Sequence, residues 1–501
     1  MNIAQLFTDK AQEQPERTAL KLDDLTVSYQ ELADASARVA GLLVARGLTP
    51  GDRVGVMLPN VPQFAAIYYG ILRAGGVVVP MNPLFKAREV AYYLSDSGAE
   101  LNFAWHGMIA EAQAGAEQTG TEVIEVDPTG FAELLASHEP SDAVIDRAAG
   151  DTAVILYTSG TTGSPKGAEL THDNLISNIA VTQSDLLRLT SDDVVFGGLP
   201  LFHAFGQTVT LNTAMSTGAT LLLLPRFDPA TALAMLERDH ATMFAGVPTM
   251  YAALLGVPDA PELPDLRICV SGGAALPVEV LHRFEKQFGC EVLEGYGLSE
   301  TSPVASFNRP GGDRKAGSIG RPVSGVEMRA VGNDGQEVAT GEVGELAIRG
   351  HNVMKGYWNK PDATRAVLAE DGWFRTGDLG RVNEDGFFFV VDRLKDLVIR
   401  GGFNIYPREI EEVFYEHPEV AEAAVIGIPH PDLGEEVGAA VSLRAGATVT
   451  GPELQDFVKQ QVAAYKYPRQ VWILDALPKG PTGKILKREI IAPASADTAA
   501  G

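Results

Sequence analysis

The chain has 501 residues, an apolar content of 45% and a formal net charge of −25. Its length suffices for about three domain-sized units. The acidic balance disfavours general binding to nucleic acid or to acidic membranes. Cys269 and Cys290 lack CxxC spacing, which favours neither a disulfide framework nor a zinc site. Without a signal peptide or an apolar run of about 18 residues, we expect a cytoplasmic protein with no transmembrane segment.

The first 150 residues or so alternate between helical and strand patterns. An amphipathic helix is expected over 29–46 and another helix over 64–74, whereas 52–58 and 76–80 have the apolar, β-branched composition of strands. Alternation of this kind predicts an α/β architecture with largely parallel sheets.

Residues 158–167, TSGTTGSPKG, are the most informative stretch of the chain. The apolar run 153–157 before it is typical of a buried strand. Glycines allow backbone N–H groups to approach a ligand closely, and the hydroxyls and Lys166 add donors and a positive charge, which together suit a polyphosphate. A Walker loop requires Ser or Thr directly after its Lys, and Gly167 stands there instead, so a P-loop kinase or GTPase is disfavoured.

This stretch resembles the phosphate loop of the acyl- and aryl-CoA synthetases, members of the adenylate-forming superfamily that also holds peptide-synthetase adenylation domains and firefly luciferase. The resemblance spans about residues 5–490, with the motifs in the family's order. It implies an α/β fold with a large N-terminal domain of mixed sheets, residues 1–393, and a small mobile C-terminal α+β domain, residues 394–501. ATP, Mg²⁺ and coenzyme A would be its cofactors. By resemblance, the loop residues that bind ATP or AMP are Thr158, Ser159, Gly160, Thr161, Thr162, Gly163 and Lys166, with Thr161 also a metal ligand.

A histidine, His203, lies in the segment GLPLFHAFG over 198–206. On its own, a histidine among aromatic residues is more often a hydrogen-bonded core residue. The family carries Pro-Leu-Phe-His here, with the histidine beside the carboxylate that is activated, so the resemblance makes His203 a catalytic residue. The expected acyl-binding wall comprises His203, Phe205, Gly206, Thr208, Val247, Gly272, Gly297 and Leu298.

Two glycine-containing segments, 270–277 and 294–301, follow strand-like runs. The first is equally well explained as an ordinary strand-to-helix turn. In the second, Tyr296 offers an aromatic face to a purine, and Glu300 offers a carboxylate of the kind that Mg²⁺ prefers. The family motif is Tyr-Gly-x-Thr-Glu, and Ser299 keeps the hydroxyl of the usual Thr. The resemblance assigns metal binding to Glu300 and ATP or AMP binding to Gly273, Ala274, Glu294, Gly295, Tyr296, Gly297 and Ser299.

The ribose and hinge motifs come next. An ionised carboxylate can accept both hydroxyls of a ribose, and the family's Thr-Gly-Asp places this role on Asp378. In the segment VDRLKD, 391–396, the family pattern gives Arg393 a ribose contact and makes Lys395 the hinge. Alone, the tripeptide 376–378 would be read as a turn, and the segment 391–396 as a solvated turn.

The last motifs lie in the C-terminal part. Gly401, Gly402 and Phe403 resemble the glycine turn that meets the thiol of CoA. Some members have Lys at the positions of Ile399 and Gly401, and this chain does not. Lys484 matches the family lysine that enters the site for adenylation.

The resemblance implies a two-step ligase. The acid would attack the α-phosphate of ATP to give an acyl adenylate, with Lys484, Glu300, His203 and Lys166 as the catalytic residues. The small domain would then rotate about Lys395, and a thiol would take the acyl group.

Several alternatives stay open at this stage. The thiol acceptor can be CoA or the phosphopantetheine of a carrier protein. The chain can also be a nucleotide-binding protein without catalytic activity. Apolar and small residues near the pocket favour a medium- or long-chain fatty acid, with a coumarate-like aryl acid second. No second cation for malonate and no Asp for an amino acid's ammonium group is evident. The sequence does not decide between a monomer and a homodimer.

Overall fold

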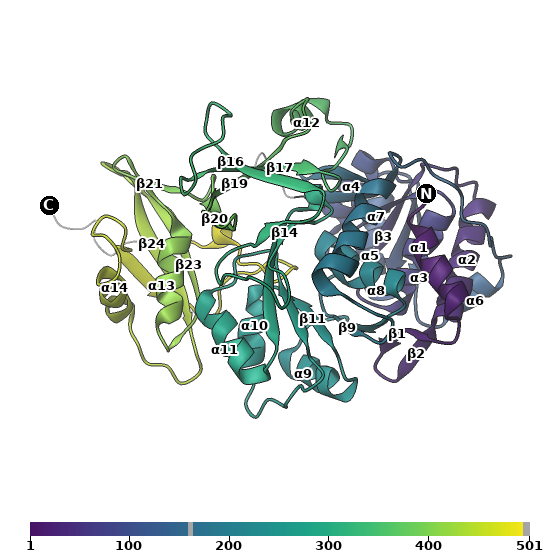
Figure 1. The fold of residues 1–501 in the computed structure, drawn as a ribbon. Coiled ribbons are helices and arrows are strands. Elements are labelled where there is room, and N and C mark those ends of the chain that lie inside the picture. The colour runs from purple at the N-terminus through teal and green to yellow at the C-terminus, as the bar shows by residue number, and fades with distance from the viewer. Residues whose placement is uncertain (159–163, 494–501) are drawn as a thin grey trace.

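The computed structural model describes residues 1–158 and 164–493. Figure 1 shows a large body formed by the purple to green part of the chain, with a smaller body of yellow-green elements beside it. Four sheets build the two bodies, and the site lies where they face each other.

The first sheet has seven strands in the order β18-β8-β7-β4-β3-β5-β6. The pairs among β7, β4, β3, β5 and β6 are parallel, whereas β8 is antiparallel to both of its neighbours. Parallel strands are covered by helices on both faces and therefore consist of nearly continuous apolar residues. The strands are β3 (Arg53–Met57), β4 (Val77–Pro80), β5 (Leu101–Trp105), β6 (Glu122–Val126), β7 (Thr152–Thr158), β8 (Lys166–Thr171) and β18 (Gly356–Tyr357).

The second sheet has nine strands in the order β15-β14-β13-β12-β11-β9-β10-β1-β2. Its central strands from β13 to β1 run parallel, and antiparallel strands flank them at both edges. The strands are β1 (Thr18–Leu22), β2 (Leu25–Ser28), β9 (Val194–Gly197), β10 (Thr220–Leu223), β11 (Met243–Gly246), β12 (Ile268–Ser271), β13 (Glu291–Gly297), β14 (Val304–Phe307) and β15 (Arg321–Pro322).

A third sheet of four antiparallel strands, β16-β17-β19-β20, lies at the top of the view in Figure 1. It leads the chain from the large body to the small one. The strands are β16 (Val326–Val331), β17 (Gly344–Gly350), β19 (Phe374–Val382) and β20 (Phe388–Arg393).

The small C-terminal domain has a sheet and an apolar core of its own. Its strand order is β22-β21-β24-β23, with β25 paired to β24, and Phe414 and Val437 are among the buried core residues. The strands are β21 (Val398–Arg400), β22 (Phe403–Ile405), β23 (Val420–His430), β24 (Gly434–Leu443) and β25 (Gln470–Ile473).

Helices connect the parallel strands and cover the sheets. Helix α2 illustrates how a local signal fixes its start, because Ser28 Oγ accepts the N–H of Glu31 and the Glu31 carboxylate accepts the N–H of Ser28. The α-helices are α1 (Ala4–Glu13), α2 (Tyr29–Ala45), α3 (Pro62–Arg73), α4 (Ala87–Ser97), α5 (Ile109–Ala116), α6 (Gly130–Ala136), α7 (His172–Val181), α8 (Thr213–Thr217), α9 (Pro229–Arg238), α10 (Pro248–Leu255), α11 (Val278–Phe288), α12 (Pro361–Val367), α13 (Pro407–Glu416) and α14 (Gly451–Lys459).

Short helices of other types occur as well. The π-helices are η2 (Thr182–Leu187) and η3 (Phe205–Asn212), and the 3₁₀ turns are η1 (His106–Met108), η4 (Ser299–Thr301) and η5 (Lys487–Glu489). The π-helix η3 is of interest because it begins two residues after His203, and such helices are frequent at functional sites.

The predicted fold class, α/β with mixed sheets and a separate C-terminal domain, is confirmed. The expected helices at 29–46 and 64–74 correspond to α2 and α3, and the expected strands at 52–58 and 76–80 correspond to β3 and β4. Within the described parts of the chain, no helix is both long and apolar enough to span a bilayer.

Candidate active site

A cleft of about 2210 Å³ lies between the large body and the small domain. The carboxyl ends of β7, β12 and β13 open into it, as expected for a ligand site on a parallel sheet. The described flanks of the predicted phosphate loop, Thr158 and Lys166, face each other across the β7–β8 pair. The predicted ATP-binding residues Ser159, Gly160, Thr161, Thr162 and Gly163 lie outside the described residues, and so does the metal-binding prediction for Thr161.

Glu300 lies beside the loop flanks and is largely buried. Its Oε1 accepts hydrogen bonds from the Thr158 hydroxyl at 3.1 Å and from the Tyr357 hydroxyl at 2.9 Å. The Lys166 ammonium stands 4.8 Å from the centre of the Tyr357 ring. Tyr357 therefore links the carboxylate and the cation that the sequence analysis selected independently.

The single carboxylate of Glu300 beside the phosphate loop is compatible with the way in which proteins usually bind Mg²⁺ together with a nucleotide. Among residues 1–158 and 164–493, no group of three or more His, Cys, Asp or Glu side chains is placed so that it could hold a metal ion. Mg²⁺ commonly takes only one or two carboxylates and completes its shell with substrate phosphates and water. Glu300, which accepts a hydrogen bond from Thr158 at the flank of the phosphate loop, could supply one such carboxylate.

A second group of polar side chains forms around Asp378. Because β19 and β20 pair with Asp378 opposite Arg393, the Arg393 Nε lies 3.3 Å from Asp378 Oδ1. The Tyr296 hydroxyl donates to Asp378 Oδ2 at 2.6 Å. Burial raises the pKa of Asp378, which Arg393 opposes. The three predicted nucleotide-binding residues thus converge from separate elements of the large domain.

Glu294 is a buried carboxyl group on β13, with 2% of its surface exposed. One oxygen accepts the N–H of Leu276 at 3.1 Å, and the other has no partner among the described residues. Burial raises the pKa of Glu294 to about 7, against the opposing charge of Arg408. The group is therefore half protonated near neutral pH.

We expect Glu294→Gln to stabilise the protein at pH 8 much more than at pH 5. A carboxyl whose folded pKa lies above its unfolded value loses its stabilising contribution as pH rises through the folded pKa, here about 7. The uncharged variant escapes that loss, so its advantage should grow by about 2 kcal/mol between these pH values. Thermal melts at both pH values measure the difference. The exposed Glu133→Gln serves as the control, and an advantage that does not change with pH would contradict the raised pKa.

Lys484 enters the cleft from the small domain. Its Cε lies 3.1 Å from the place where a Cβ on Gly273 would stand, so the side chain passes directly over Gly273, which has a φ of +81°. Burial and the charge of Arg393 together lower the pKa of Lys484 to about 8, and the charges of Asp378 and Glu300 oppose this shift. Lys484 is thus a partly buried cation that lines the same cleft as Asp378 and Glu300 and interacts electrostatically with both.

His203 lines the same part of the cleft as Lys484. Its Nδ1 accepts the N–H of Phe205 at 3.3 Å, which leaves the proton of the neutral ring on Nε2. Burial, with the charge of Lys484, lowers the pKa of His203 to about 3, so the ring is neutral at physiological pH. A small recess here is lined by Leu199, Pro200, His203, Phe205, Gly206, Val247, Gly273, Thr482 and Lys484.

Some of the other predicted site residues line the cleft, and some lie outside it. Gly272, Ala274, Gly295, Gly297, Leu298, Ser299 and Lys395 line the cleft. Thr208 does not, because it is buried behind it and donates to the carbonyl of Ser302 at 3.1 Å. Gly401, Gly402 and Phe403 also lie outside the cleft, where Phe403 is 56% exposed and stacks on Tyr465.

Two residues of the site were missed by the sequence analysis. Tyr357 reaches Glu300 because β18 pairs with β8, and nothing near Tyr357 in the sequence signals that pairing. Thr249, at the start of α10, donates its hydroxyl to the carbonyl of Gly483 at 2.9 Å, a contact across 234 positions of the chain.

Comparison with known proteins identifies the family. The model of the AMP-binding enzyme family matches residues 7–358, and that of the AMP-binding enzyme C-terminal domain matches 409–484. A long-chain-fatty-acid–CoA ligase of Bacillus subtilis is 37% identical, over 98% of this chain and 94% of the relative. A feruloyl-CoA synthase of Amycolatopsis is 38% identical, over 96% of each chain. The chain belongs to the AMP-binding enzyme family, and the predicted acid–thiol ligase class is confirmed.

Solved structures agree with the family and also bear on the domain arrangement. ATP-bound MatB from Rhodopseudomonas palustris superposes with a TM-score of 0.91 at 37% identity, covering 97% of each chain. The apo form of the same protein, at the same identity and coverage, gives 0.81. The present structure therefore has an overall arrangement closer to the ATP-bound form than to the apo form.

Proposed function

We propose that the protein activates a fatty acid of medium or long chain to its acyl adenylate and transfers the acyl group to coenzyme A. As an acid–thiol ligase of the AMP-binding family, it uses ATP, Mg²⁺ and CoA. The observation that supports the adenylation step best is the position of Lys484. This small-domain lysine stands in the cleft among His203, Asp378 and Glu300, where two anionic substrates would meet.

In the proposed first step, a carboxylate oxygen attacks the α-phosphate of ATP and pyrophosphate leaves. Both reactants are anions, so buried positive charge must offset their repulsion. Lys166 would contact the phosphates near the loop, and Lys484 would contact the reacting carboxylate and α-phosphate. The proton on His203 Nε2 would orient a carboxylate oxygen. Magnesium, held through Glu300, would supply charge neutralisation on the phosphates.

The nucleoside would be held by the Asp378 group. Asp378 would accept the ribose hydroxyls, and Arg393 would keep its carboxylate in place. Tyr296, fixed by its bond to Asp378, would form part of the base pocket. The glycine-rich segments around Gly273 and Gly295 would allow the base to approach the backbone.

In the proposed second step, the small domain rotates about Lys395, withdraws Lys484 and brings Gly401 and Gly402 to the cleft. The thiolate attacks the acyl carbon and AMP leaves. The exposure of the turn at Gly401–Phe403 supports this assignment, since a surface reserved for another domain orientation must be free in this one. Neither Cys269 nor Cys290 would participate, because both are buried behind the site.

The nature of the acid is proposed from the wall of the cleft beside His203, where Phe205, Val247 and Gly272 are apolar or small. The recess next to them has a volume of only about 10 Å³ and could hold no more than a small group. The body of the acid would therefore lie along the cleft wall, where an apolar, uncharged body fits better than a dicarboxylate or an amino acid. An aryl acid is the second candidate, because the feruloyl-CoA synthase and the fatty-acid ligase are almost equally similar to this chain.

Incubation with ATP, Mg²⁺ and a panel of fatty and aryl acids, with and without CoA, tests the proposal. Mass spectrometry would follow AMP, acyl adenylate and acyl-CoA. Acyl-CoA from fatty acids is the expected result. Acyl-CoA from aryl acids alone would correct the acid class, and adenylate that leaves CoA untouched would indicate a carrier-protein thiol. The absence of adenylate with every acid would contradict the adenylation step.

We also expect adenylation to decline at alkaline pH. Lys484 has its pKa lowered from 10.5 to about 8, so the free enzyme loses this cation as pH rises through 8. The value of kcat/KM for ATP, which reports groups of the free enzyme, should fall about tenfold per pH unit above that point. The variant Lys484→Arg should lack this decline because its guanidinium stays protonated. A wild-type profile that is flat to pH 10 would contradict the assignment.

A further inference from the structure

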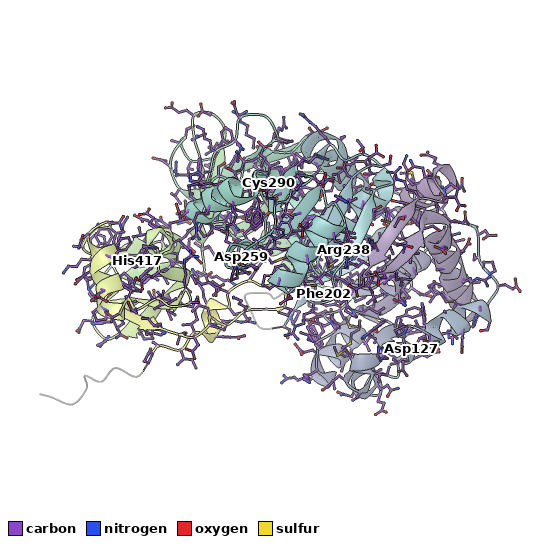
Figure 2. All side chains as sticks on the ribbon, turned by 90° about the horizontal axis from the view of Figure 1, so that it is seen from below. Asp127, Phe202, Arg238, Asp259, Cys290 and His417 are labelled. Carbon is purple, nitrogen blue, oxygen red and sulfur yellow. The ribbon has the colours of Figure 1, made fainter. Side chains whose placement is uncertain are left out.

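Lys484 sits on a short hairpin that projects from the small domain into the cleft. Lys479 and Ile485 form the bridge at its base, and the N–H of Gly480 donates to the carbonyl of Lys484 at 2.8 Å. At the base, the Lys479 ammonium pairs with Glu422 of the small-domain sheet at 2.8 Å. Figure 2 shows the yellow C-terminal segment reaching from the domain that carries His417 toward the large domain. The hairpin tip, residues 480–484, is therefore anchored at its base and extends away from its own domain.

The large domain holds this tip through Thr249. The Thr249 hydroxyl donates to the carbonyl of Gly483, the residue before Lys484, at 2.9 Å. Among the described residues, this is the single hydrogen bond between residues 480–484 and the large domain. Other bonds across the seam lie further away, such as that from the N–H of Val278 to Glu412 on α13. Those bonds hold the rest of the small domain against the large domain, whereas the bond from Thr249 holds the hairpin tip.

The local geometry of both Thr249 and Gly483 favours this hydrogen bond. Thr249 is the second residue of α10, directly after Pro248, and its β-branched side chain has few rotamers. Gly483 has a φ of +79°, and a Cβ there would stand 3.0 Å from both Thr249 Oγ1 and Val247 Cγ2. A larger residue at 483 would thus separate the carbonyl from the hydroxyl.

We propose that Thr249 is a positioning residue for the first half-reaction, holding the hairpin tip so that the Lys484 ammonium stands at the reacting groups. This inference rests on the proposed function of Lys484. Thr249 acts only in the domain orientation that places Lys484 in the cleft. The second half-reaction, in which the hairpin has left, does not depend on it.

Thr249→Val, which keeps the shape and removes the donor, tests the proposal. Loss of one hydrogen bond should reduce acid-dependent ATP–pyrophosphate exchange by about fivefold to tenfold. Conversion of synthetic acyl adenylate to acyl-CoA should stay within about twofold of wild type, since that step lacks the contact. Thr249→Ser, which keeps the hydroxyl, should restore exchange. Equal loss in both half-reactions, unchanged exchange, or no rescue by serine would overturn the assignment.

Thr220→Val is the matched control. The Thr220 hydroxyl also donates to a backbone carbonyl, that of Thr18, at 2.9 Å, and it lies on β10 outside the cleft lining. We expect this variant to leave both half-reactions unchanged. A loss of exchange as large as that of Thr249→Val would mean that any buried threonine bond affects the first step, which would overturn a specific role.

A second measurement needs no substrate. Docking of the tip restrains residues 480–484, so in Thr249→Val the backbone amides of this segment should take up deuterium faster than in wild type, expressed as a ratio to uptake by helix α14. Peptide mass spectrometry measures this ratio. If the wild-type enzyme showed no pyrophosphate exchange with any of the acids, the proposed function would be contradicted. Active wild-type enzyme with unchanged deuterium uptake and pyrophosphate exchange in Thr249→Val would overturn the role of Thr249 alone.

Discussion

Lys484→Ala should reduce the rate of acyl adenylate formation by about a hundredfold to a thousandfold, the usual cost of removing one preorganised charge or donor from a transition state. The lysine is a cation that the small domain contributes to the cleft, and its charge acts on His203, Asp378 and Glu300, which line the same cleft. Without it, the repulsion between the substrate carboxylate and the α-phosphate has less compensation. Acid-dependent ATP–pyrophosphate exchange is the direct measurement.

The same variant should convert synthetic acyl adenylate and CoA to acyl-CoA at a rate close to wild type. In the proposed second orientation Lys484 has left the cleft, so its loss has no direct effect there. Lys459→Ala is the matched control, because Lys459 is an exposed lysine of the same domain on α14. Equal loss of both half-reactions in Lys484→Ala would show that the residue supports the fold or the nucleotide site and not one chemical step.

The sequence was sufficient for those parts of the site that depend on local patterns. The strand before the phosphate loop was visible as an apolar run, and β7 ends at Thr158 as expected. Asp378 and Arg393 were selected as separate motifs, and the β19–β20 register brings them together as a cross-strand pair. The alternation of helices and strands predicted parallel sheets, although it could not give the strand order, which depends on long-range packing.

Long-range contacts account for what the sequence did not reveal. Tyr357 and Thr249 are ordinary residues in their own segments, and each gains a role only through a partner far along the chain. Thr208 was expected in the acyl wall because the family resemblance puts His203 there and Thr208 follows it closely in the sequence. The π-helix η3 instead buries Thr208 and turns its hydroxyl to Ser302. The position of Gly401–Phe403 outside the cleft depends on the orientation of a whole domain, for which no local pattern exists.

Glu300→Gln should lower the rate of adenylation by about a hundredfold or more and raise the Mg²⁺ concentration needed for half-maximal rate, since an amide binds Mg²⁺ far less well than a carboxylate. Glutamine keeps the size of the side chain and can still accept from Thr158 and Tyr357, so the fold should be retained. A magnesium titration of pyrophosphate exchange measures both effects. Tyr357→Phe provides the graded comparison, because it removes one donor to Glu300 and leaves the charge, and should cost only about fivefold. If Glu300→Gln left the magnesium dependence unchanged, the ion would have to be held without this carboxylate, and Glu300 would instead serve to fix Thr158 and Tyr357 beside the phosphate loop.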